Sequence, residues 1–91
     1  MPVLHQPDQH RFTVATTAGD AELVYHARPD GTLDLRHTFV PPKARGGRIA
    51  SDLVQAAIVH ARSNKLKLVA TCTYVQSWVA RHPEEQELFV S

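Results

Sequence analysis

Two glycines and three cations gather where a helix is expected to begin. The stretch "VPPKARGGRIAS", residues 40–51, places Lys43, Arg45 and Arg48 around that start. A helix N-terminus already carries about half a positive charge, so cations there are unfavourable unless an anion binds. Glycines allow a ligand to approach the backbone closely, and first-turn amides form an anion site. A bound phosphate or pyrophosphate would explain the cations; an ordinary turn with solvated side chains is the alternative.

Three preceding segments alternate between polar and apolar residues, as strands do: 10–17, 21–28 and 32–39. The turns between them are Ala18-Gly19 and "PDG". Pairing Thr17 with Asp20, and Arg28 with Thr32, predicts an antiparallel meander with one apolar face, which carries Phe12, Val14, Leu23, Tyr25, Leu33, Leu35, His37 and Phe39. The wet face carries Thr13, Glu22, His26, Arg28, Asp34, Arg36 and Thr38, with Val24 as an exception.

The rest of the chain predicts a cover for the apolar face. Residues 48–63 repeat apolar side chains at three- and four-residue spacing, which predicts an amphipathic helix. Residues 64–72 turn into a short strand, and residues 74–90 form a helix that breaks at Pro83. The order β-β-β-α-β-α predicts an α+β fold, with a crossover helix that makes the fourth strand parallel to the third. Residues 1–9 are expected to be a loose tail before a single domain over 10–91.

Composition narrows the class of protein. The 91 residues suffice for one modest domain, and a net charge of +1 gives no field that would favour nucleic acid. We expect no membrane segment, because no apolar run approaches the ~20 residues of a spanning helix. The single cysteine and the absence of a signal-peptide pattern favour the cytoplasm. The six histidines show no metal-ligand spacing, so no metal site is expected.

Residues 33–88 resemble the small, single-domain branch of the GNAT-type N-acetyltransferases, through "HTFVPPKARGGRIASDLVQAAIVHAR" and "KLVATCTYVQSWVARHPEEQEL". That superfamily holds the pyrophosphate of acetyl-CoA with a loop of pattern Arg/Gln-x-x-Gly-x-Gly/Ala. Here Arg45 and Ala50 fit the pattern, and Arg48 stands where glycine is usual. The resemblance implies a minimal GNAT-like fold and a bulged strand end at Phe39-Val40, whose amide polarises the thioester. It also implies a cofactor loop made of Arg45, Gly46, Gly47, Arg48, Ile49, Ala50 and Ser51.

Acetyl transfer to an amine needs a polarised carbonyl, a deprotonated amine and a protonated leaving thiolate. The candidates for moving protons are Cys72, Tyr74 and His37, which the predicted fold places near strand ends. Cys72 is either an acyl-accepting nucleophile or a small residue lining the site. Tyr74 is a proton donor or a packing residue, and His37 is a base or a core histidine. Family members often carry glutamate where Phe39 stands, so the base stays open.

The sequence therefore predicts an acetyl-CoA-dependent N-acetyltransferase. Its partners would be acetyl-CoA and an amine acceptor, on a small molecule or a protein. The alternative is a non-catalytic module that binds acyl-CoA or another phosphate-bearing anion. Members of the superfamily with more residues insert two helices between their first strands. Only Ala18-Gly19 stands there in this chain, so an open acceptor site is expected. The acceptor, and whether a homo-oligomer forms, are left open by the residues.

Overall fold

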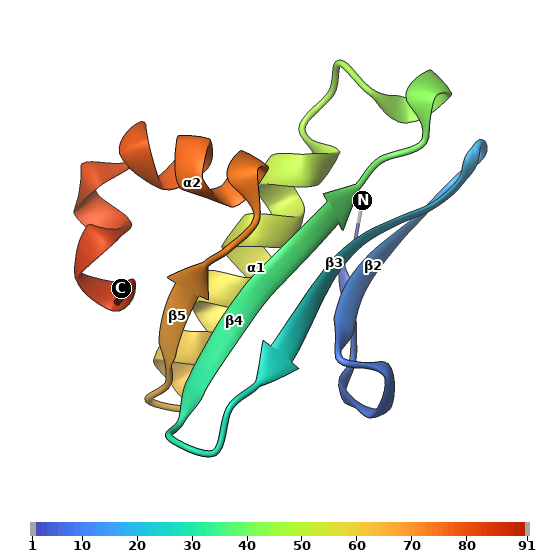
Figure 1. Cartoon of the computed structure of the whole chain (residues 1–91). Helices are drawn as coiled ribbons and strands as arrows, with labels where there is room; N and C mark the ends of the chain where they lie inside the picture. Colours follow the sequence, from blue (N-terminus) through green and yellow to red (C-terminus); the bar gives the residue numbers. More distant parts are fainter. Residues whose placement is uncertain (1, 91) are drawn as a thin grey trace.

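A five-stranded sheet is covered on one face by helix α1, Ile49–Ser63 (Figure 1). The computed structural model describes residues 2–90. Its strands are β1 Leu4–Gln6, β2 Arg11–Thr16, β3 Gly19–Ala27, β4 Thr32–Phe39 and β5 Lys67–Ala70. They lie in chain order, antiparallel from β1 to β4 and parallel between β4 and β5. Helix α2, Thr73–Ala80, follows β5, and short 3-10 helices cover Pro7–Gln9, Pro42–Ala44 and Pro83–Leu88. The α+β fold with a crossover helix is confirmed.

The core forms between the sheet and α1, as the alternation predicts. The buried sheet residues are Phe12, Val14, Ala21, Leu23, Tyr25, Leu33, Leu35 and Leu68. Helix α1 contributes Leu53, Val54, Ala57, Ile58 and Ala61, and α2 contributes Val75, Trp78 and Val79. The side-chain amide of Asn64 donates to the His60 carbonyl at 2.9 Å and satisfies one free acceptor where α1 ends. Within residues 2–90, no helix has the length and apolar character needed to cross a bilayer.

The β2–β3 hairpin is displaced by two residues from the predicted register. Thr16 pairs with Gly19, so the turn is Thr17-Ala18 and Phe12 faces Leu23. The Thr16 hydroxyl donates to the Gly19 carbonyl at 2.5 Å and accepts from the Ala18 amide at 3.1 Å, which stabilises this turn. Gly19 has a φ of 119°, which favours glycine. A shift of two residues keeps each side chain on its predicted face.

A β-bulge in β4 overturns the predicted faces beyond Leu35. Tyr25 pairs with Leu35 but Val24 pairs with His37, which leaves Arg36 as the extra residue. The alternation inverts after it, so Thr38 lies opposite buried Leu23 and shares its face. The predictions that His37 and Phe39 face the core, and that Thr38 faces solvent, are wrong. The predicted bulge at Phe39-Val40 is also wrong, because the extra residue lies three positions earlier.

The N-terminal segment is anchored, and the expected loose tail is wrong for the residues that form β1. Leu4–Gln6 pair with β2, whereas Met1 lies outside the described residues. The His5 ring stacks on Phe12 with a centroid distance of 4.3 Å and meets His60 edge-on at 4.5 Å. Its Nε2 lies 2.6 Å from the Tyr25 hydroxyl. The segment therefore reaches the core through the His5 ring and Val3, which strand alternation in a three-residue segment could not reveal.

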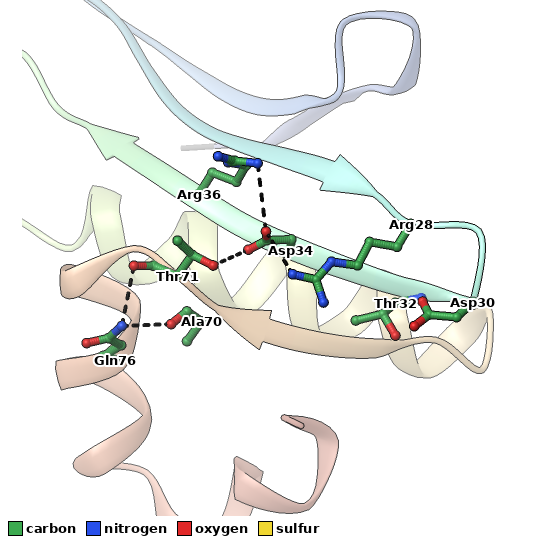
Figure 2. A network of polar contacts seen from close by, with 8 residues as sticks. All are labelled: Arg28, Asp30, Thr32, Asp34, Arg36, Ala70, Thr71 and Gln76. Atoms are coloured by element: carbon green, nitrogen blue, oxygen red, sulfur yellow. Dashed lines mark hydrogen bonds and ion pairs between the residues drawn. The ribbon is translucent and has the colours of Figure 1, made fainter. Parts of the chain in front are cut away.

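The sheet face opposite α1 carries a polar network centred on Asp34 (Figure 2). The Asp34 side chain is only 6% exposed, and its carboxylate pairs with Arg28 at 3.2 Å and Arg36 at 3.9 Å. The Thr71 hydroxyl donates to the same carboxylate at 2.5 Å. Gln76 of α2 donates to the carbonyls of Ala70 and Thr71 at 2.9 and 3.3 Å. These contacts fix the chain between β5 and α2, immediately before Cys72.

The His5 contacts predict that stability falls on acidification. Burial, and then the charge of His60, lower the pKa of His5 below its usual 6.5. As pH falls through ~6.5, the unfolded chain takes up a proton that folded His5 resists. The free energy of unfolding should therefore decrease there, and level off below the folded pKa. His5→Gln should flatten this slope in urea denaturation measured from pH 8 to 5. Leu4→Gln on the same strand should keep it, and equal slopes in both variants would exclude His5 as the cause.

Candidate functional site

The candidate site lies where β4 and β5 separate. Their parallel pairing ends at Leu35 and Ala70. The Leu35 carbonyl accepts from the amides of Thr71 at 3.1 Å and Cys72 at 2.9 Å, after which the chain turns into α2. Strand β4 continues to Phe39, so its end and the start of α2 diverge (Figure 1). We call this opening the β4–β5 split; it lies between residues 38–40 on one side and Cys72 and Tyr74 on the other.

Two adjoining hollows occupy the split and its margin at the start of α1. The first, of about 270 Å³, is lined by Thr38, Val40, Arg45, Ala50 and Tyr74. The second, of about 200 Å³, is lined by Val40, Ala44, Arg45, Gly46, Gly47, Ile49, Ala50 and Tyr74. The structure thus brings six predicted cofactor residues, Val40, Arg45, Gly46, Gly47, Ile49 and Ala50, together with the predicted proton donor.

A larger hollow, of about 480 Å³, lies where α1 ends, on the other side of the core. Its lining includes His5, Tyr25 and His60. His5 is hydrogen-bonded with Tyr25, and His60 with Asn64. The two smaller hollows are the candidate site, because they lie at a helix N-terminus that has no capping side chain.

The start of α1 has the properties of an anion site. Arg48 is the N-cap residue and supplies no capping hydrogen bond, and the first helical bond runs from the Asp52 amide to its carbonyl at 2.8 Å. The amides of residues 49–51 therefore precede the first helical donor. The Arg45 Nε donates to the Val40 carbonyl at 2.8 Å, which ties the loop to the end of β4. Within residues 2–90, neither these arginines nor Lys43 has a carboxylate partner.

The two glycines of the loop differ in their requirement. Gly46 has a φ of 93°, a conformation that side chains rarely adopt, so the backbone itself demands glycine there. Gly47 has no positive φ, and a Cβ placed on it would meet no protein atom within 4 Å. Internal packing therefore does not require glycine at position 47. The open space beside it is available to a ligand.

Two predicted cofactor residues, Ser51 and Phe39, do not line either hollow. The Ser51 hydroxyl accepts a hydrogen bond from the Trp78 indole at 2.9 Å, which joins the first turn of α1 to α2. Ser51 can therefore serve an anion at the first turn through its backbone amide, and not through its hydroxyl. Phe39 is 40% exposed, because the alternation that inverts at Arg36 turns its side chain away from the core. Only its backbone is therefore available at the split.

Cys72 occupies the N-cap position of α2 and is 9% exposed. Its sulfur lies 3.4 Å from the Thr38 hydroxyl across the split. Burial raises the pKa of the thiol, but the Thr38 hydroxyl and the amides of Val75, Tyr74 and Thr38 outweigh it, so the pKa lies below its ordinary value. The thiol makes no capping hydrogen bond to α2, yet these hydrogen-bond donors favour the thiolate over the thiol. The predicted cysteine therefore lies at the split in an ionisable environment.

Tyr74 lies on the α2 side of the split and lines both hollows. Burial raises the pKa of its phenol, Arg81 opposes the shift, and charge on Cys72 adds to it. Tyr74 is therefore protonated near neutrality and can donate a proton. His37, the third predicted catalytic residue, is wrongly placed by the alternation: it pairs with Val24, is exposed, and faces away from α1. Thr38 takes its place, and no signal in the alternation identifies that residue.

Comparison with known proteins shows the family to which the chain is similar. The model of the GCN5-related N-acetyl-transferase family Acetyltransf_CG matches residues 11–88. Protein NATD1 of Danio rerio is 34% identical over 88 residues, covering 94% of this chain and 80% of the relative. Protein NATD1 of Homo sapiens is 35% identical, covering 94% of this chain and 78% of the relative.

A solved structure supports the fold independently. The solution NMR structure of a GCN5-like protein from Staphylococcus aureus superimposes with a TM-score of 0.74 at 19% identity. The match covers 99% of this chain and 88% of the other. With the family model spanning β2 to the end of the last 3-10 helix, the chain belongs to the GCN5-related N-acetyltransferase family.

Proposed function

We propose that this protein is an acetyl-CoA-dependent N-acetyltransferase. One observation carries the proposal: the uncapped N-terminus of α1 lines the same hollows as Tyr74, and the Cys72 sulfur lies 3.4 Å from the hydroxyl of Thr38, which lines one of them. An anion-binding helix start supports cofactor binding, and the proton-active groups beside it support transfer. Neither feature alone would distinguish an enzyme from a phosphate-binding module.

The residues present fit acetyl-CoA. The amides of residues 46–51 would hold the pyrophosphate, with Arg45 and Arg48 adding charge. The pantetheine arm would follow the split, because the end of β4 there lacks a neighbouring strand. An amide at Phe39 or Val40 would then polarise the thioester carbonyl. The bound cofactor supplies an activated acetyl group.

The proton-active groups divide the work of transfer. Direct attack by the amine requires that its N–H bond break, and a Cys72 thiolate can accept that proton as an S–H bond forms. As the C–N bond to the amine forms and the thioester C–S bond breaks, Tyr74 would donate its proton to the sulfur of departing CoA. Cys72 gains one proton and Tyr74 loses one in each transfer. Passage of a proton from Cys72 to Tyr74, directly or through water, therefore restores both groups. His37 has no part in this scheme.

The acceptor side is open. Within residues 2–90, no helix covers the sheet face opposite α1 (Figure 1). A small amine would find little concave surface there. We therefore infer that the acceptor is an amine on a larger molecule, such as a protein or a polyamine.

Cofactor binding can be tested at the loop. Arg45→Glu should weaken CoA binding about tenfold or more and flatten its salt dependence, because a phosphate contact becomes a repulsion. Gly47→Ala should weaken CoA binding while the melting temperature stays unchanged, since its Cβ meets no protein atom within 4 Å. Calorimetric titration with CoA measures both. Lys65→Glu, a charge reversal beyond the far end of α1, is the matched control. Unchanged affinity in both loop variants would remove this loop from the site.

The route of transfer can be tested at Cys72. Direct transfer with Cys72 as the base predicts that Cys72→Ser binds CoA normally but turns over acetyl-CoA far more slowly, because a serine hydroxyl is a poor proton acceptor; direct transfer with Cys72 only lining the site predicts that most turnover remains. Either form of direct transfer predicts no acetyl adduct on the unmodified protein by intact-mass analysis during turnover. A kinetically competent acetyl-Cys72 would instead establish a covalent route. Full turnover of the serine variant would reduce Cys72 to lining the site, and CoA binding without any turnover would favour the non-catalytic alternative.

A further inference from the structure

The hydrogen bond between Thr38 and Cys72 is the side-chain link across the split. The Thr38 Oγ1 and the Cys72 Sγ lie 3.4 Å apart, and the residues are 34 positions apart in the chain. Thr38 belongs to β4 and lines the larger site hollow together with Tyr74. Cys72 begins α2. The contact therefore forms between the two walls that a thioester would enter.

The bulge in β4 creates this contact. Arg36 is the extra residue, and without it the alternation would point His37 inwards and Thr38 towards solvent. Bulges recur beside functional sites, where they redirect a side chain. Here the redirected group is a hydroxyl, and its position opposite Leu23 aims it towards the α1 side of the sheet. The bulge thus places the neutral hydroxyl of Thr38 at the split, in place of the titratable imidazole of His37.

The ionisation state of the sulfur decides the direction of the hydrogen bond. In the thiol form either atom can donate, and sulfur is a weak partner. A thiolate can only accept, so the Thr38 hydroxyl must then donate, and a charged acceptor strengthens the bond. The amides of Tyr74 and Val75 act in the same sense from the first turn of α2. The contact is therefore worth more to the thiolate than to the thiol.

We propose that Thr38 is a positioning residue whose hydroxyl donates to the Cys72 sulfur and holds it as a thiolate at the β4–β5 split. This inference rests on the proposed function, because a held thiolate serves transfer only if a thioester binds beside it. Thr38 itself exchanges no proton with substrate. It acts through Cys72, by fixing the sulfur's charge and direction.

Isosteric replacement tests the proposal without any cofactor. Thr38→Val removes the hydroxyl and preserves shape, whereas Thr38→Ser keeps the hydroxyl. Cys72 ionisation is measured by thiolate absorbance near 240 nm and by the pH dependence of alkylation with iodoacetamide. We expect Thr38→Val to raise the pH of half-ionisation by about one to two units, the size of a hydrogen bond to a charged group. Thr38→Ser and the control Thr17→Val, at the hairpin turn, should leave it unchanged.

The outcomes separate this inference from the proposed function. An unchanged half-ionisation pH in Thr38→Val overturns the role of Thr38, even if CoA binds. If the valine variant does not fold, the unmodified protein decides: a Cys72 half-ionisation at or above the ~8.5 of a free thiol also overturns it. Failure of the unmodified protein to bind CoA overturns the proposed function alone. With activity present, Thr38→Val should shift the pH profile of kcat upwards, which a merely structural role would not do.

Discussion

The carbonyl oxygen of Leu35 determines where the site can form. It accepts hydrogen bonds from two successive amides, those of Thr71 and Cys72, and so ends the parallel ladder between β4 and β5. Leu35 is fully buried, so this end point is held by the core. Beyond it β4 runs on without a neighbour on that side while the other chain turns into α2. The ladder of β3 and β4 acquires its extra residue immediately afterwards, at Arg36. One buried residue therefore separates the regular sheet from the split.

Two helix N-termini meet at this split, and both favour negative charge. Helix α1 offers amides without a capping side chain beside Arg45 and Arg48, and α2 begins at the thiol of Cys72. The hydrogen bond from the Trp78 indole to the Ser51 hydroxyl links the two helices within their first and second turns. Because Trp78 is buried, that link is protected from water. A single indole thus links the uncapped start of α1 to the helix that begins at Cys72.

Strand alternation and helical periodicity predict most of the fold because burial repeats with the backbone period. They predict the core face of β2 and β3, a helix over residues 48–63, which is observed as Ile49–Ser63, and the parallel β5. They fail where one residue breaks the period, so His37 and Thr38 exchange faces at the bulge. They also miss β1, whose three residues are too few to show a period and whose anchoring depends on His5 contacts distant in sequence. The loop motif predicts that residues 45–51 gather at the start of α1, and five of them line one hollow there; that they bind a cofactor stays a prediction. Proton-active residues depend on tertiary placement, which is why one of the three predicted ones lies outside.

The sheet face opposite α1 carries a buried carboxylate, although no helix within residues 2–90 lies above it. Asp34 lies on that face, yet Arg28, Arg36 and Thr71 shield it and satisfy its charge. Breaking such a pair would leave a buried charge without compensation, so the network keeps its geometry. Its consequence reaches the site through Thr71, because the same residue donates its amide to Leu35 and its hydroxyl to Asp34. The residue before Cys72 is therefore held from the core side and from the open face at once. The turn from β5 into α2 is thereby anchored on both faces of the sheet, immediately before the residue that begins α2.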